Sequence, residues 1–506
     1  MPDKGPNILL LTTDQQRYDT IAALGNRHIR TPALDRLCAE GTAFRRAYCT
    51  NPLCSPSRAS ILTGLMPSQH RCWNVGVGLP EDARTLPSLL RSAGYTSAVI
   101  GKVHLQPCLQ PGSPEAAPRI FDFDHFRRWR GPYYGFEACE LAIGHTREPH
   151  AAGMHYGLWL RDRGVDVARY FGGAPSHELG EGTGPEGRWA LPQEHHNSRW
   201  VADRAIHFLR QQVGRDGSFF LWASFQDPHM PFVAPSPWFD IYAQAPPPLP
   251  AWDPGELDTR PVLYRAAYEG WFPRLGLGDA FGAPGFADLD HRAIPPTRAR
   301  QWTAAYYAMI ALLDHHTGRI LDALDELGLS RNTLVVFTSD HGEFLGHHGL
   351  WGKGPFHLED LLRVPLIARW PGVVPGGRCS SALQSLADLT PTFLAAACVP
   401  LPAGLAGINQ LPVWTGNRAA GRSTALVENR VSDRLYVKTV ITDRHKLTVH
   451  LPGDEGELYD MEADAAEEVN LWSNPAHGDL ARHMLCTLLA ADAALEPPAP
   501  PRSAYA

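Results

Sequence analysis

The chain is organised around one segment, Asn51-Pro52-Leu53-Cys54-Ser55-Pro56-Ser57-Arg58-Ala59-Ser60-Ile61-Leu62-Thr63-Gly64. Its first residues favour a turn, and Ser55 as N-cap with Pro56 at the first helical position predicts the start of a helix. Cys54 would then lie just before the helix N-terminus, where backbone N–H groups and the helix dipole favour an anion. Arg58 follows about one turn later and can lean back over the same place. The segment therefore predicts an oxyanion-binding site with a reactive cysteine at its centre.

The pattern Cys-x-Pro-x-Arg at positions 54–58, followed by Leu62-Thr63-Gly64, resembles the signature of the type I, formylglycine-dependent sulfatases of the alkaline phosphatase superfamily. In that family the cysteine at the position of Cys54 is oxidised after synthesis to formylglycine, and the hydrated aldehyde supplies the nucleophilic hydroxyl. A lone cysteine near a helix start is, however, more often a buried and chemically idle residue. The remaining segments of the chain decide between the two interpretations.

Composition restricts the class of protein. The chain has 506 residues, 44% of them hydrophobic and 20% charged, which is ordinary for a globular enzyme with one large and one smaller domain. The net charge of -7 argues against nucleic acid or an anionic membrane as the main partner. The nine cysteines have no regular spacing, which is typical of a reducing compartment. Because we find neither a signal peptide nor an apolar run of ~20 residues, we expect a cytoplasmic protein.

Four apolar runs without polar alternation predict strands that are buried on both faces, as in a parallel sheet. Polar, titratable side chains follow each run within a few residues. Because ligands of open α/β sheets bind at the carboxyl ends of the strands, these side chains should lie at one edge of the sheet. The residues that this argument brings together are Asp14, Lys102, His104, His229, Asp340 and His341.

Two of these segments resemble the metal-binding segments of the sulfatases. Asp14-Gln15 follows the first strand, where many sulfatases have Asp-Asp, and Asp340-His341 follows the fourth, where many have Asp-Asn. Both variants resemble those of phosphonate monoester hydrolases and choline sulfatases. The resemblance implies one divalent ion bound by Asp14, Gln15, Asp340, His341 and residue 54. Oxygen ligands suit Ca²⁺ and a histidine favours Mn²⁺, so the sequence leaves both open.

The resemblance also implies catalytic roles. Lys102 and His104 match the family's G-K-x-H motif, in which the lysine holds the formylglycine hydroxyl and the histidine removes a proton to expel sulfate. His229 lies in a segment similar to P-H-x-P and is implied to protonate the leaving alcohol. Lys353 matches a lysine that binds the anionic oxygens of the ester. The implied catalytic set is Cys54, Arg58, Lys102, His104, His229 and Lys353.

The residues implied for substrate binding are Asn74, His229 and Lys353. Asn74 lies twenty residues beyond Cys54, where phosphonate monoester hydrolases have an asparagine that contacts substrate. An asparagine that only forms a turn explains this position at least as well. The alcohol part of the substrate stays open between aryl, choline and carbohydrate sulfates.

The resemblance implies an α/β fold like that of alkaline phosphatase, with a large central, mostly parallel sheet sandwiched by helices. A small C-terminal α+β subdomain with an antiparallel sheet is expected after it, because residues 435–441 and 445–450 alternate in polarity and predict a hairpin. We place the boundaries as follows: a catalytic domain at 1–418 with long insertions at about 106–200 and 235–298, and a C-terminal subdomain with a proline-rich tail at 419–506.

These matches predict an arylsulfatase-like hydrolase of sulfate monoesters. A phosphonate monoester or phosphodiester hydrolase is the first alternative, since it shares Cys54 and both metal-segment variants, but retention of Lys102 and His104 favours the sulfatase. A binding protein without activity would be expected to have lost a motif residue, and a thiol redox protein would need a second cysteine near Cys54. The implied partners are a small sulfate ester, a formylglycine-generating maturase and further copies of the chain in a dimer or tetramer, with no nucleic acid and no membrane.

Overall fold

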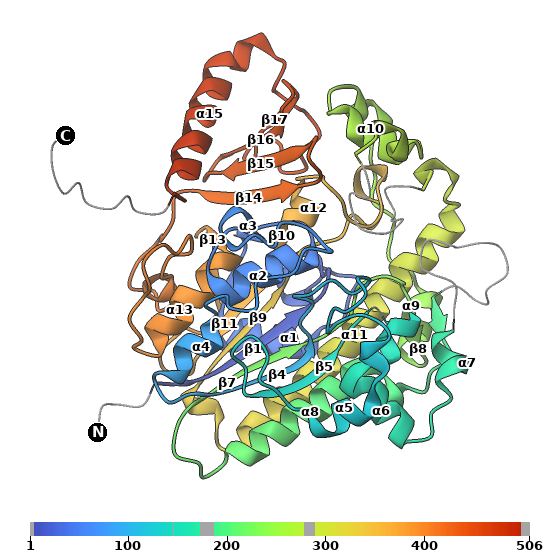
Figure 1. Cartoon of the computed structure of the whole chain (residues 1–506). Coiled ribbons are helices and arrows are strands. Elements are labelled where there is room, and N and C mark those ends of the chain that lie inside the picture. Colours follow the sequence, from blue (N-terminus) through green and yellow to red (C-terminus); the bar gives the residue numbers. More distant parts are fainter. Residues whose placement is uncertain (1–4, 145, 173–186, 278–288, 497–506) are drawn as a thin grey trace.

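The computed structural model describes residues 5–144, 146–172, 187–277 and 289–496. An eight-stranded sheet lies at the centre with helices on both faces, and a four-stranded sheet with one long helix lies beside it (Figure 1). The predicted α/β fold, with a mostly parallel central sheet and a small antiparallel sheet near the C-terminus, is confirmed. The proline-rich tail beyond residue 496 and parts of both predicted insertions lie outside the described residues.

Five parallel strands form the half of the central sheet that carries the predicted site residues. β1 (Asn7–Thr13) pairs with β7 (Phe219–Ser224) on one side and β9 (Thr333–Ser339) on the other. β4 (Thr96–Lys102) pairs with β7, and β5 (Ala138–Ala142) forms the edge next to β4. Because all five strands run in the same direction, the residues that follow β1, β4, β7 and β9 emerge at one edge of the sheet, as predicted.

The other half of the sheet contains its one antiparallel strand. The strand order is β12-β2-β11-β9-β1-β7-β4-β5, and β11 (Leu366–Arg369) runs against both β9 and β2 (Thr42–Phe44). β12 (Arg378–Ser380) pairs in parallel with β2. Short strands form two further sheets. One contains β10 (Arg363–Val364), β3 (Ala47–Tyr48) and β13 (Gln384–Ser385). The other contains β6 (Arg188–Trp189) and β8 (Ala234–Pro235).

The central strands are apolar on both faces because two helical layers cover them. In β1, Ile8 and Leu10 pack into one hydrophobic cluster and Leu9 and Leu11 into the other, and all four are fully buried. The helices on the Leu9 side are α1 (Pro32–Glu40), α8 (Asn197–Gln212) and α11 (Pro296–Glu326), and those on the Ile8 side are α2 (Cys54–Thr63), α4 (Leu86–Arg91) and α13 (Leu389–Ala396). Across the described ranges, no helix is both long and apolar enough to cross a membrane.

The region between β4 and β7 contains elements that the sequence analysis did not identify. The strand β5 extends the central sheet there, although its sequence Ala-Cys-Glu-Leu-Ala is too short to show a period. Besides α8, the helices of this region are α5 (Phe123–Arg128), α6 (Met154–Asp162) and α7 (Val167–Phe171), and those between β8 and α11 are α9 (Trp238–Gln244) and α10 (Val262–Tyr268). These five are shorter than three turns, so each has few apolar positions from which to recognise it.

The C-terminal sheet has the strand order β14-β15-β16-β17 and is antiparallel throughout. The predicted hairpin is confirmed as β15 (Tyr436–Ile441) and β16 (His445–Leu451), between β14 (Ala425–Arg430) and β17 (Gly456–Asp460). α15 (Gly478–Ala493) lies beside this sheet (Figure 1). Its residues Met484 and Leu488 pack into the hydrophobic cluster of the sheet. The domain boundary at residue 418 stays a prediction.

β14 also contacts the segment that leads into α2. The amide of Asn51 donates to the carbonyl oxygen of Glu428 at 2.6 Å, and the backbone N–H of Glu428 donates to the carbonyl of Thr50 at 2.9 Å. The C-terminal sheet therefore stabilises the turn immediately before Cys54.

The end of β4 predicts a difference between two glycine substitutions. Gly101 has a φ of +104°, and a Cβ there would lie 1.9 Å from the carbonyl oxygen of Ser224, whereas Gly94 has a φ of +80° with no atom within 4 Å of its added Cβ. Both alanine variants incur about 1–2 kcal/mol of left-handed backbone strain. Only Gly101→Ala adds a clash, which would displace Lys102. We therefore expect Gly101→Ala to lower the thermal unfolding temperature clearly more than Gly94→Ala. Equal shifts would contradict this packing of β4 against β7.

Candidate active site

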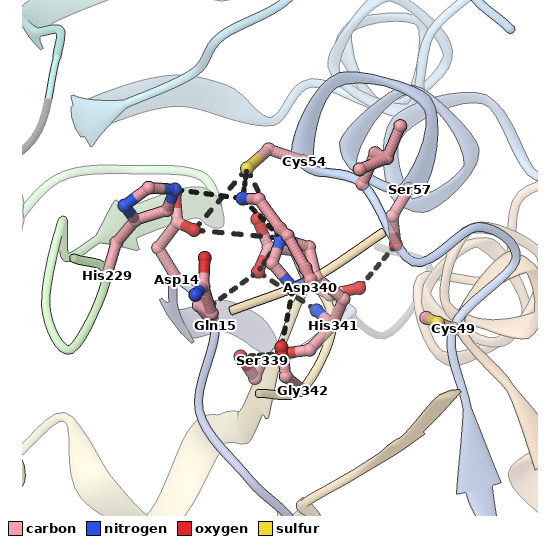
Figure 2. A network of polar contacts seen from close by, with 12 residues as sticks. Asp14, Gln15, Cys49, Cys54, Ser57, His229, Ser339, Asp340, His341 and Gly342 are labelled. Carbon is pink, nitrogen blue, oxygen red and sulfur yellow. Dashed lines mark hydrogen bonds and ion pairs between the residues drawn. The ribbon is translucent and has the colours of Figure 1, made fainter. Parts of the chain in front are cut away.

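Cys54 is the first residue of α2, and Leu53 is its N-cap without a side-chain cap. The predicted N-cap Ser55 is therefore wrong, because the extended backbone at Leu53 lets the helix start earlier. The Cys54 side chain points into a buried group of polar residues (Figure 2). Its Sγ lies 3.5 Å from Oδ1 of Asp14 and 3.2 Å from Nε2 of His341. The thiol thus lies among the predicted metal ligands, as the sequence suggested.

Backbone contacts hold together the loops that carry these ligands. The N–H of Asp14 donates to the carbonyl of Asp227 at 3.1 Å, which joins the ends of β1 and β7. The N–H of Gln15 donates to Oδ1 of Asp340 at 3.0 Å, which joins the ends of β1 and β9. The hydroxyl of Ser57 in α2 donates to the carbonyl of Asp340 at 2.6 Å. The start of the helix and three strand ends are therefore fixed to one another.

Four side chains could hold a metal ion. The ligand atoms of Asp14, Cys54, Asp340 and His341 all lie within 4.8 Å of one another, and each residue is buried. Gln15 lies beside them (Figure 2), and its Oε1 is buried without a hydrogen-bond donor among the described residues. A buried oxygen without a donor normally has an ion or water as partner. The residues present therefore fit a divalent cation.

Arg58 and Lys102 lie behind the two carboxylates and are fully buried. Arg58 donates through Nε to Oδ2 of Asp340 at 2.8 Å and through Nη2 to Oδ2 of Asp14 at 3.2 Å. Its Nη1 donates to the carbonyl of Lys102 at 2.9 Å and to the hydroxyl of Ser224 at 2.8 Å. Nζ of Lys102 is ion-paired with Oδ2 of Asp14 at 2.6 Å. In this arrangement both cations hold the carboxylates in place.

The two carboxylates ionise differently because they lie close together. Burial and Cys54 would raise the pKa of Asp14, but Lys102, with His229 and Arg58, holds it well below its ordinary value. Burial raises the pKa of Asp340, and the charge of Asp14 adds to this effect. A cation bound between them would relieve the repulsion.

Lys353 reaches the centre of the group from the loop after β9. Its Nζ lies 2.9 Å from Sγ of Cys54, 2.8 Å from Nε2 of His229 and 3.2 Å from Nε2 of His341. His229 and His341 each contact a backbone carbonyl through Nδ1, at 2.7 Å and 2.9 Å. Since a carbonyl only accepts, each Nδ1 carries the proton. Each ring therefore presents Nε2 to the centre of the site.

The Cys54 thiol lies in a positive environment. Burial alone would raise its pKa, but the charges of Lys353 and Lys102 hold it well below the ordinary value, with smaller contributions from His341 and from a hydrogen bond with His104. A lowered thiol pKa beside cations is typical of a reactive cysteine. His104 has a φ of +56°, and the N–H of the next residue donates to the buried Glu115 at 3.2 Å. Glu115 thus helps to hold the backbone that carries His104.

Asn74 is buried between the loop after α3 (Pro67–His70) and the C-terminal sheet. Its amide donates to the carbonyls of Arg430 and Val431 at 3.4 Å and 3.3 Å. A role for Asn74 in contacting substrate stays a prediction.

Sequence reasoning missed three residues that support the site. Glu343 accepts a hydrogen bond from the Gln15 side chain, and the Tyr306 hydroxyl donates to the carbonyl of Gln15 at 2.7 Å. Arg17 donates to the carbonyl of Phe344 at 3.1 Å. Glu343 and Arg17 had a signal in the sequence, because they follow Asp340-His341-Gly342 and Asp14-Gln15-Gln16 directly. Tyr306 lies in the middle of a long helix and has no local pattern that marks it.

Comparison with known families agrees with this geometry. The family model "Sulfatase" matches residues 6–399, and the model "N-sulphoglucosamine sulphohydrolase, C-terminal" matches residues 346–493. The chain therefore belongs to the sulfatase family of the alkaline phosphatase superfamily. Membership supports the hydrolysis of sulfuric ester bonds as its activity.

Individual relatives are similar over nearly the whole chain. The multifunctional alkaline phosphatase superfamily protein PehA of Trinickia caryophylli is 30% identical over 512 residues, which covers 94% of this chain and 93% of that protein. An arylsulfatase of Clostridium perfringens is 29% identical, with coverages of 92% and 90%. Among solved structures, the phosphonate monoester hydrolase from Silicibacter pomeroyi has a TM-score of 0.78 at 25% identity, with coverages of 97% and 96%. The resemblance to both sulfatases and phosphonate monoester hydrolases is thus confirmed.

The charges around Cys54 predict a change in its ionisation. In metal-free protein with an unmodified cysteine, Lys353→Met removes the nearest ammonium while keeping the side chain's length. We expect the pKa of Cys54 to rise by about 1–3 units, the size of effect that one close charge produces. Thiolate absorbance, measured as the difference from Cys54→Ser, gives this pKa. Cys72 and Cys139 do not interfere at neutral pH, since burial raises the pKa of each to about 12. An unchanged pKa would contradict the contact between Lys353 and Cys54.

Proposed function

We propose that this chain hydrolyses sulfate monoesters with a formylglycine formed from Cys54 and one divalent ion, Ca²⁺ or Mn²⁺. The ion would be held by Asp14, Gln15, Asp340, His341 and residue 54. The observation that carries the proposal is the position of Cys54 at a helix start, within 4.8 Å of the ligand atoms of both aspartates and His341.

A bound divalent ion would lower the pKa of a hydroxyl on residue 54 and withdraw negative charge from the ester oxygens. The chain's own groups supply the remaining steps. Asp340 would take the proton of the attacking hydroxyl. Arg58 and Lys102 fix the two aspartates, and the charge of Lys102 also acts on residue 54. Nζ of Lys353 lies 2.9 Å from Sγ of Cys54, which supports a role for Lys353 in binding the anionic oxygens of the ester.

Proton transfer to the leaving alcohol would come from His229 together with Lys353. Their nitrogen atoms lie 2.8 Å apart, and the contact of Nδ1 with the carbonyl of Met230 keeps Nε2 directed inward. In the second half of the reaction, His104 would remove the proton of the remaining hydroxyl of residue 54. Sulfate then leaves as the aldehyde re-forms, and water adds to the aldehyde to regenerate the diol, so water does not attack sulfur.

The modification of Cys54 would require a formylglycine-generating maturase. Because Cys54 is only 2% exposed in the folded chain, we infer that the maturase acts on the unfolded polypeptide, in the cytoplasm. We further propose that the mature chain assembles as a dimer or tetramer. Peptide mass spectrometry of active protein should find formylglycine at position 54, and fully active protein with only cysteine there would contradict the proposal.

The second candidate function is the hydrolysis of phosphonate monoesters or phosphodiesters at the same site. It is favoured by Gln15 and His341, the variants that resemble those of the phosphonate monoester hydrolases, and by the TM-score of 0.78 to one of them. Lys102 and His104 favour sulfate esters, because they match the G-K-x-H motif of the sulfatases.

A substrate comparison tests the choice between the two functions. We expect formylglycine-bearing protein to have a higher kcat/KM for an aryl sulfate than for the matching phenylphosphonate ester, and Cys54→Ala to lose both activities. A higher kcat/KM for the phosphonate would replace the sulfatase assignment with the second candidate.

His104 and Lys102 provide a test of the proposed steps. His104→Ala should slow steady-state turnover of an aryl sulfate by about 100- to 10,000-fold, with a smaller effect on the first release of alcohol, and residue 54 should accumulate in a sulfated form. Lys102→Ala should slow both phases, since its charge acts on the nucleophile and on Asp14. Single-turnover kinetics with mass spectrometry separate the phases, and wild-type rates in both variants would remove them from the mechanism.

A further inference from the structure

Gln15 differs from the other candidate metal ligands because the two ends of its amide have opposite polarity. Its Oε1 can bind a cation, whereas its Nε2 would repel one. Both orientations have nearly the same shape, so packing alone does not choose between them. In this structure Nε2 donates to Oε2 of Glu343, and the buried Oε1 is left without a donor among the described residues.

Glu343 can hold this orientation because its other oxygen is already occupied. Its Oε1 accepts from the backbone N–H groups of Leu345 at 2.9 Å and Gly352 at 2.6 Å. Backbone N–H groups cannot exchange donor for acceptor, so Oε2 must face Gln15. The three hydrogen-bond partners of the side chain among the described residues are all donors, which suits an ionised carboxylate.

The backbones of both residues are held by the same neighbours. Gln15 has a φ of +68°, which is uncommon for a residue other than glycine. The Tyr306 hydroxyl donates to the carbonyl of Gln15 at 2.7 Å and accepts from the N–H of Arg17 at 2.9 Å. The Arg17 guanidinium donates to the carbonyl of Glu343 at 2.6 Å. Strained backbone of this kind persists only where surrounding contacts enforce it.

We propose that Glu343 is a positioning residue that turns the Gln15 amide so that its oxygen faces the metal ion. A second aspartate at the position of Gln15 would place its negative charge directly on the ion. Here that charge lies one hydrogen bond further from the ion, on Glu343. This inference rests on the metal site of the proposed function. It assigns a role to a residue that does not itself contact the ion.

The substitution Glu343→Gln tests this role without changing the size of the side chain. Its single carbonyl oxygen is required by the two backbone N–H groups, so its new NH₂ group must face Gln15. Gln15 then turns over to accept that hydrogen bond and presents its own NH₂ to the ion. We expect the affinity for Mn²⁺ to fall by about 10- to 100-fold, which is typical of lost contacts behind a metal ligand.

Exchanging the two residues should restore binding. In the double variant Gln15→Glu/Glu343→Gln, the new amide at 343 donates to the new carboxylate at 15, which still offers an oxygen to the ion. Hydrogen bonds, volume and net charge are all conserved. We expect its Mn²⁺ affinity to return to within about 10-fold of the wild type. A residue with only a structural role at position 343 would not be rescued by a change at position 15.

Isothermal titration calorimetry of metal-free protein with unmodified Cys54 measures these affinities for Mn²⁺, and for Ca²⁺ in a parallel series. Thermal unfolding reports the folding of each variant separately. Wild-type affinity in Glu343→Gln, or no recovery in the double variant, would overturn the proposal. If Glu343→Gln does not fold, the double variant decides alone, since it keeps every hydrogen bond. Wild-type protein that binds neither ion would instead contradict the metal site of the proposed function.

Discussion

The balance of charge between two buried aspartates and two buried cations is the interaction on which the site depends. Asp14 and Asp340 lie side by side without solvent, and Arg58 is hydrogen-bonded to both. Burying an unpaired charge costs several kcal/mol, so neither carboxylate could remain there alone. Because Arg58 comes from α2 and Lys102 from β4, the pairs also join four separate elements. The position of Cys54, one turn before Arg58, follows from the same contacts.

This balance explains why the site suits an anionic substrate. Arg58 and Lys102 offset the two aspartates, so a bound divalent ion and Lys353 would leave the centre with net positive charge. The lowered pKa of Cys54 reflects the same field acting on the residue that we propose as the source of the nucleophile. Since these groups are buried, their interactions are less screened by salt than those of surface charges. The site would therefore offer a sulfate or phosphonate ester both positive charge for its anionic oxygens and a nucleophile for its sulfur or phosphorus atom.

Most of the site could be predicted because parallel strands place their carboxyl ends at one edge. Asp14, His229 and Asp340 each follow a recognisable apolar strand. Asp14 contacts Cys54, His229 contacts Lys353, and a carboxylate oxygen of Asp340 lies within 4.8 Å of Sγ of Cys54. The role of Arg58 was less predictable. Its position one turn after Cys54 suggested that it leans over an anion, but Nε, Nη1 and Nη2 of its guanidinium each donate to a protein group.

What the sequence could not show are contacts that depend on loop conformation. The pairing of Gln15 with Glu343 joins residues 328 positions apart, and it requires a left-handed backbone at Gln15 for which no local residue pattern exists. The start of α2 was misplaced because serine is a favourable N-cap, yet the extended Leu53 precedes the helix. The strand β5 is too short for its period to be read, and only its pairing with β4 identifies it. Residue propensities and hydrophobic periods predict individual helices and strands, whereas these features depend on contacts between separate elements.

The central claim is that residue 54, two aspartates, Gln15 and His341 form one centre around a single divalent ion. The most direct measurement is the anomalous diffraction of crystals of formylglycine-bearing protein grown with Mn²⁺. The account predicts one strong peak surrounded by Asp14, Gln15 Oε1, Asp340, His341 and residue 54, at ligand distances of about 2.0–2.6 Å, with Lys353 outside the ligand shell. A peak at another place, or Lys353 still between His229 and His341 with no ion bound, would contradict it.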